Sequence, residues 1–368
     1  MNLPQKQFAN GYSLIELLVA MALGLIVVGA GVAIFRSATN MTQLAFSRSD
    51  MQQNARGTLA IITRDLSQAS IGIPQSGIAL PSGGTGAALA ACGPTQCYLQ
   101  NGTYPNNLLA PVVPFAAQGA NNSDAITVVY VDNSWPDTNK TLTDVAQNGS
   151  AITVNTGTFD SSGNPAPPPA GHAYDDPVYG SKPGDVMMIF NTHGYSVATV
   201  TGVAAGGVLS MAAGDPLNLN QPTATAGNVS ALRNAPNPFP DGPQIYPTTS
   251  AVRINVVTYF IQTNPGPDGA LGTADDYPVL MRQLNAQNAI PLVDYASAMQ
   301  VTYDIYNSLN STYQAALDGA QVGNASEIRK INISLTLQSP AAGQGKNEAY
   351  TINTAVSPRD LSFKDRYN

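Results

Sequence analysis

One carboxylate, Glu16, lies within an apolar run from residue 14 to residue 35 that holds no other charged side chain. Gly11 precedes this run, whereas the small-residue cleavage site of an ordinary secretory signal follows the apolar segment. Cleavage after Gly11 would remove a short polar leader, keep the apolar segment and create a new amine on Tyr12. Because a carboxylate inside a membrane is costly and usually has a partner, we expect Glu16 to pair with the Tyr12 amine of a neighbouring copy.

These residues resemble the cleavage region of type IV prepilins, whose leader ends in Gly and is followed by an aromatic residue, a hydroxyl residue and Leu-Ile-Glu-Leu. Here Gly11 is followed by Tyr12, Ser13 and the sequence LIEL, with Tyr where the family usually has Phe. The resemblance implies cleavage after Gly11 by prepilin peptidase, N-methylation of Tyr12, and docking into a helical filament through Glu16. The alternative is a plain signal anchor, in which Glu16 would be an unexplained charge.

A second stretch, residues 51–69, indicates which prepilin-like proteins the chain resembles. Its sequence, MQQNARGTLAIITRDLSQA, is similar to the N-terminal region of PilW-type minor pilins, where an Asn-Ala-Arg segment precedes an Arg-Asp-Leu segment. The J-type minor pseudopilins of type II secretion carry a related pattern, so both groups stay open. The resemblance implies an α+β type IV pilin fold, in which a long N-terminal helix packs on an antiparallel β-sheet, here with large loop insertions.

The two cysteines, Cys92 and Cys97, lie in the sequence CGPTQC. In an oxidising compartment this spacing favours a disulfide across a tight Gly-Pro turn, which would staple the loop locally. A metal site is the alternative, but two thiols are half of a tetrahedral zinc set and no His lies nearby.

An acidic loop, residues 264–277, has the sequence NPGPDGALGTADDY. Asp268, Asp275 and Asp276 offer the hard oxygen ligands that calcium prefers. The loop departs from an EF-hand, since Gly266 occupies the third position and an Asp the twelfth. Calcium is the only cofactor that the sequence suggests, and none is required. The alternative is a hairpin loop with solvated carboxylates.

A long helix is expected to position the N-terminal site. Residues 14–35 would span ~33 Å as a helix, which is enough to cross a hydrocarbon core of about 30 Å. The helix should continue to about residue 69, where Gly72 and Pro74 stop it. Its second part carries an apolar stripe formed by Leu44, Met51, Ala55, Leu59, Ile62 and Leu66. The charged residues are expected largely off this stripe: Arg48, Asp50, Arg56, Arg64 and Asp65.

The remainder reads as β-rich, with an irregular insertion at 71–123. Strand patterns occur at residues 125–131, 151–154, 184–211, 253–262, 278–284, 299–305, 331–337 and 350–356. The chain thus divides into a leader at 1–11, a transmembrane and filament-core half of the helix at 12–35, its amphipathic half at 36–70, and an extracytoplasmic β-rich pilin domain at 71–368.

Composition restricts the functional classes. The net charge is −7 with 11% charged residues, and without a basic stripe no direct nucleic-acid contact is expected. The sequence lacks a P-loop, a Gly-x-Ser-x-Gly elbow and an HExxH motif, so we do not expect an enzyme.

Together with the resemblance, these observations predict a low-copy minor pilin at or near the tip of a type IV pilus. It would help to start pilus assembly, in twitching motility, adhesion or DNA uptake. Its partners would be other minor and major pilins and prepilin peptidase. It would lie in the inner membrane with a periplasmic domain, and then on the cell surface in the pilus. A J-type pseudopilin and a pilus-borne adhesin are the alternatives.

Overall fold

The first element, α1 (Leu14–Gln68), is a single helix of 55 residues. The computed structural model describes residues 13–84, 108–135, 141–156, 158–159, 165–166, 173–222, 227–233, 248–307, 310–339 and 348–363. One compact unit ends at Gln53 and a second begins at Asn54. In the described chain, α1 is the one helix long and apolar enough to cross a membrane.

The predicted end of α1 is confirmed. The helix stops at Gln68, and the chain then turns through Gly72, whose φ is +70°. A Cβ at this position would lie 2.7 Å from a methyl carbon of Val131, so both the backbone angle and the close approach require glycine.

The second part of α1 buries one face, as its apolar pattern predicts. Ala55, Leu59, Ile62 and Leu66 are all buried. Leu44, expected on the same stripe, is instead exposed.

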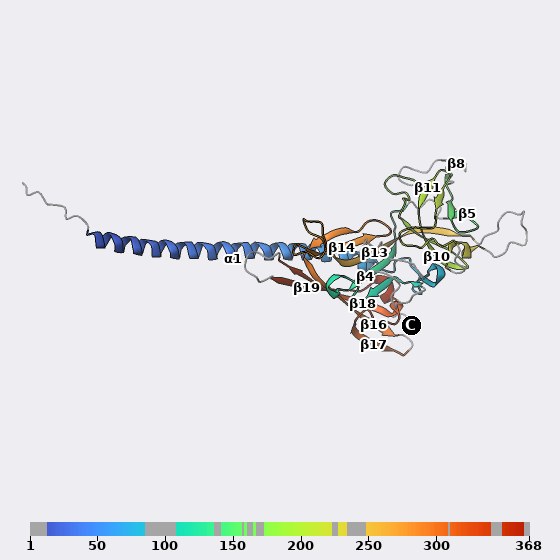
Figure 1. The fold of residues 1–368 in the computed structure, drawn as a ribbon. Helices are drawn as coiled ribbons and strands as arrows, with labels where there is room; N and C mark the ends of the chain where they lie inside the picture. Colours follow the sequence, from blue (N-terminus) through green and yellow to red (C-terminus); the bar gives the residue numbers. More distant parts are fainter. Residues whose placement is uncertain are drawn as a thin grey trace, which may run out of the picture. The chain divides into compact units, whose positions relative to one another are not determined.

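A seven-stranded antiparallel sheet forms the centre of the second unit (Figure 1). Its main path runs in the order β10-β9-β13-β14-β15, with β4 and β3 attached on β13. The strands are β3 (Val112–Phe115), β4 (Ala125–Val131), β9 (Val186–Asn191), β10 (Gly194–Thr199), β13 (Ser250–Asn264), β14 (Tyr277–Leu284) and β15 (Ile290–Asp294).

The long strand β13 organises this sheet. Ile254 pairs with both β9 and β4, so these strands lie on opposite edges of β13. Val257 pairs with both β4 and β14, so β14 continues along the same edge as β9. Both faces of β13 are largely buried, as its apolar pattern predicts.

Two four-stranded antiparallel sheets complete the second unit. The first has the order β11-β12-β6-β5 and consists of β5 (Leu142–Val145), β6 (Ala151–Val154), β11 (Gly202–Ala204) and β12 (Val208–Ser210). The second has the order β17-β16-β18-β19 and consists of β16 (Ala296–Asn307), β17 (Thr312–Leu317), β18 (Ile328–Gln338) and β19 (Ala349–Val356).

Short elements connect these sheets. They are the pairs β1 (Ile78–Ala79) with β2 (Leu108–Leu109) and β7 (Thr158–Phe159) with β8 (Pro165–Ala166), the single turns η1 (Pro81–Gly84), η2 (Ala120–Asn122), η3 (Val229–Leu232) and η4 (Ala325–Glu327), and α2 (Arg359–Phe363).

A separate hydrophobic cluster surrounds Trp135. It joins the β5, β6 and β12 side chains Val145, Ile152 and Leu209 to Met187 and Ile189 of β9. The indole N–H of Trp135 donates to Ser181 Oγ at 3.0 Å, so this large residue buries its ring without leaving its donor unpaired.

The α+β class and the antiparallel pairing are confirmed. The described chain therefore combines a long apolar N-terminal helix with antiparallel sheets, an architecture consistent with a pilin-like protein.

Candidate functional site

The side chain of Glu16 lies in the first turn of α1. Its Oε2 accepts a hydrogen bond from the backbone N–H of Ser13 at 3.0 Å. A Ser before the helix and a Glu three residues later form the pattern of a capping box. The bond from the Ser13 N–H to the Glu16 side chain is one of the two hydrogen bonds of that box. A carboxylate here also interacts favourably with the positive end of the helix dipole. Glu16 therefore helps to begin the helix while it stays exposed.

The helix surface around Glu16 is apolar and uncovered. Leu14 is 80% exposed and Leu17 is 59% exposed, and large exposed apolar side chains continue to Phe35. An exposed apolar surface of this size marks a membrane or protein contact. The segment is thus suited to a bilayer or to a bundle of similar helices, and Glu16 is its one charge.

Residues 7–32 match the family described as the prokaryotic N-terminal methylation motif. This match supports a type IV pilin-like protein, either a pilin or a pseudopilin. It implies processing by prepilin peptidase, assembly with other pilins, and membrane anchoring before assembly. Pilins are structural subunits and are typically not enzymes. No curated protein and no solved structure matches the chain.

Some of the predicted site residues lie outside the described part of the chain. They are Gly11 and Tyr12 of the cleavage site and Cys92 and Cys97 of the predicted disulfide. Cleavage, methylation and the disulfide therefore stay predictions.

The carboxylates of the acidic loop are bonded within the loop. Asp275 accepts from the Thr273 hydroxyl at 2.7 Å, and Asp276 accepts from the Gly272 N–H at 2.6 Å. Asp268 accepts from the Ala270 N–H at 2.8 Å. The Thr273 hydrogen bond is the main reason that the pKa of Asp275 is lowered.

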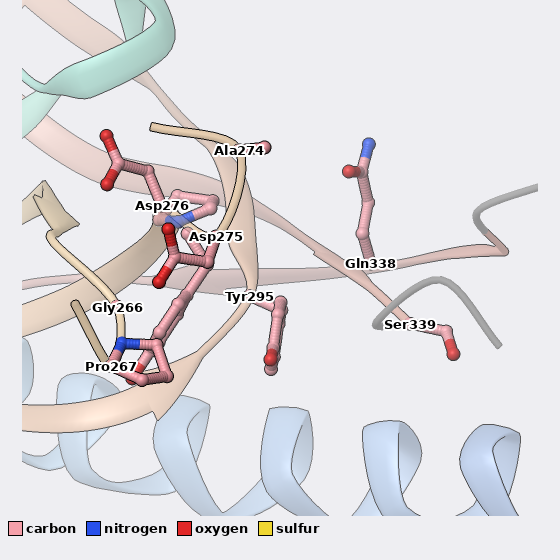
Figure 2. Close-up of a pocket in the computed structure, with 10 residues that line it drawn as sticks. Gly266, Pro267, Ala274, Asp275, Asp276, Tyr295, Gln338 and Ser339 are labelled. Atoms are coloured by element: carbon pink, nitrogen blue, oxygen red, sulfur yellow. The ribbon is translucent and has the colours of Figure 1, made fainter. Parts of the chain in front are cut away.

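Figure 2 shows Asp275 and Asp276 at a pocket that also includes Tyr295, Gln338 and Ser339. Within the described residues, no group of three His, Cys, Asp or Glu side chains is placed to hold a metal. The loop can close on its own hydrogen bonds, and calcium binding stays a prediction.

A buried carboxylate that the sequence did not reveal fixes α1 to the sheet. Asp65 is 1% exposed, and its Oδ2 accepts from the Tyr259 hydroxyl at 2.6 Å. The same oxygen accepts from Nε and Nη2 of Arg282 at 2.9 and 2.8 Å. Oδ1 accepts from the Tyr130 hydroxyl at 3.4 Å. One helix residue thus binds β4, β13 and β14.

This Asp65 network, formed by Asp65, Tyr130, Tyr259 and Arg282, also perturbs its tyrosines. Burial, reinforced by the Asp65 carboxylate, raises the pKa of Tyr130 to about 12. The same two causes raise the pKa of Tyr259. Both hydroxyls are therefore neutral donors at physiological pH.

The prediction that Asp65 lies off the buried face of the helix is wrong. Asp65 follows Ile62 by three residues, which places both on one side of a helix. This spacing was the available signal, but the charge of Asp65 argued against burial. The charge is tolerated because Arg282 and two hydroxyls satisfy it.

Proposed function

We propose that this protein is a PilW-type minor pilin of a type IV pilus that enters the filament at or near its tip and helps to start assembly. The observation that carries the proposal is Glu16, the single charge in the exposed apolar segment of α1 from residue 14 to residue 35, within the matched methylation motif. The site acts by binding a neighbouring subunit, so its chemistry is charge pairing.

The energetics favour a partner for Glu16. On insertion scales an ionised Asp at the centre of a membrane helix costs about 2.5–3.5 kcal/mol; Glu16 lies in the first turn of α1, so this figure is an upper bound for its cost. The Ser13 N–H gives Glu16 one hydrogen bond but no compensating charge. After cleavage at Gly11, the Tyr12 amine of an adjacent subunit would supply that charge. A solitary anchor would gain only the helix cap from Glu16 and no partner for its charge.

The size of the second unit supports a low-copy role in the filament. Besides its central sheet it carries a further four-stranded sheet over the Trp135 cluster. A globular part with several sheets is bulky, which suits a terminal subunit better than one packed throughout a filament.

Two substitutions at Glu16 separate charge pairing from helix capping. Glu16→Gln keeps a side-chain oxygen that can accept the Ser13 N–H, because Gln also serves in capping boxes, but it removes the charge. Glu16→Ala removes both. We expect both variants to insert and to be cleaved normally, yet to leave cells with few surface pili and little twitching motility.

The outcomes distinguish the functions. Normal piliation in Glu16→Gln at wild-type protein levels would refute charge pairing, and normal piliation in both variants would return the chain to a plain anchored protein. Normal piliation combined with lost protein secretion would instead identify a J-type pseudopilin.

A further inference from the structure

The outer edge of β19 is an unprotected sheet edge. In the described part of the chain, β19 ends the order β17-β16-β18-β19 and pairs with β18 alone. Its sequence, AYTINTAV, has no charge, Pro or Gly. Its register with β18 is continuous over all eight residues. A long, regular and uncharged edge is a template for pairing with another strand.

Other edge strands of this protein carry the usual protection. β15 contains Pro291 and Asp294 and has a register shift against β14. β17 and β5 also have register shifts, and β11 has only three residues. At β10, Asn220 bonds the backbone N–H and C=O of Thr199. The contrast sets β19 apart within one molecule.

One hydrogen bond determines which backbone groups of β19 are free to pair. The Ser339 N–H donates to the carbonyl of Glu348 at 2.8 Å, and these two residues continue the β18–β19 register. Because inward and outward groups alternate along an antiparallel pair, the outward residues are Ala349, Thr351, Asn353 and Ala355. The side chains of these outward residues are exposed as well.

We propose that β19 pairs, through these outward residues, with an extended and uncharged strand of a neighbouring pilin-like subunit. This inference rests on the proposed function. Strand addition draws its affinity from main-chain hydrogen bonds, and β19 has no charge to attract a distant partner. Such an edge binds best to a partner that is already held nearby, since tethering raises the effective concentration of that partner. Subunits whose α1 helices share one bundle meet this condition.

The test places a photo-crosslinking amino acid at Ala355 in the full-length protein, expressed in piliated cells. Ala355 is suitable because it is exposed and outward. We expect adducts whose mass equals this chain plus one other pilin-like subunit. Asn353→Pro removes one outward N–H but no bond to β18, which an edge strand tolerates. It should reduce the adducts by about two- to tenfold, the effect of one lost ladder hydrogen bond.

Two controls make the result specific. Asn353→Ala keeps the backbone N–H and should keep the adducts, and the same probe at Gln314 on the shifted edge strand β17 should give none. Equal adduct yields in Asn353→Pro and Asn353→Ala, with equal melting temperatures, would overturn the inference. Adducts between two copies of this chain alone would also overturn it, because the partner would then be a second copy.

The experiment distinguishes a wrong inference about strand pairing at β19 from a wrong proposal about the filament role. A wild-type protein that is found in sheared filaments but gives no adduct would refute strand pairing and leave the filament role intact. A wild-type protein absent from sheared filaments would refute both.

Discussion

Replacing Asp65 tests what holds α1 to the sheet. Asp65→Asn keeps the size of the side chain but removes the charge, and it leaves the guanidinium of Arg282, 14% exposed, without its carboxylate. Removing one partner of a buried ion pair costs about 3–5 kcal/mol. Oδ2 here takes three donor contacts within 2.9 Å, so we expect a loss within that range. The total free energy of unfolding of a folded protein is ~5–15 kcal/mol, so this loss is a large share of it.

The neighbouring residue provides the matched control. Arg64 lies 3.6 Å from the same carboxylate but is 68% exposed, so water screens the pair. Arg64→Ala should therefore cost under ~1 kcal/mol.

The assay is denaturant unfolding of the full-length protein in detergent. Trp135 is the only tryptophan and is 4% exposed, so its fluorescence reports on unfolding of the second unit. Asp65→Asn should lower the denaturant midpoint while the slope stays unchanged. If Asp65→Asn and Arg64→Ala unfold at the same midpoint, the reasoning is refuted.

A double variant tests whether the loss in Asp65→Asn comes from the charge of Arg282 left buried without its carboxylate. Adding Arg282→Met to Asp65→Asn removes the uncompensated charge, so the combined loss should be smaller than the sum of the two single losses. Additive losses would show that the two residues act independently.

Three further outcomes are expected. The pKa of Tyr130 is about 12 in the folded protein and ~10 in an unfolded chain. The contribution of Tyr130 to the free energy of unfolding should therefore be fully present below pH ~10 and should be lost as the pH rises towards 12. In Tyr130→Phe the free energy of unfolding should fall less steeply over this pH range. Mass spectrometry of the filament-associated protein should find a chain that begins with methylated Tyr12, and Gly11→Ala should leave the leader attached. Calcium should raise the melting temperature and a chelator should reverse this, with no response in Asp275→Ala; identical melting curves would contradict the calcium hypothesis.

Local pattern predicted a large part of the fold. The strands Ala125–Val131 and Ala151–Val154 occur with the predicted bounds, since apolar β-branched runs between turn residues indicate strands. The strand patterns at 253–262 and 278–284 fall within β13 and β14, and these two strands, which follow one another in the chain, pair with each other. Each of these features depends on residues that are close in sequence.

The missed features depend on distant residues. Asp65 is buried by Tyr259 and Arg282, which are 194 and 217 residues away, and no local pattern reveals such partners. β17 is exposed at nearly every position, so it shows no alternation. At the candidate site, the sequence identified Glu16, but its bond to Ser13 emerged only from the helix geometry.

The position of β13 in the chain also sets an order of folding. β3 with β4 and β9 with β10 are hairpin neighbours that can pair as soon as each has been made. Neither hairpin can join the other until residues 250–259 of β13 have emerged, because β13 lies between them. The almost fully buried strand β4 therefore waits for a partner more than a hundred residues downstream, as Tyr130 pairs with Asn255. Such long-range pairing slows folding and exposes apolar strands meanwhile, so newly made chains of this protein should be more vulnerable to aggregation and proteolysis than finished ones.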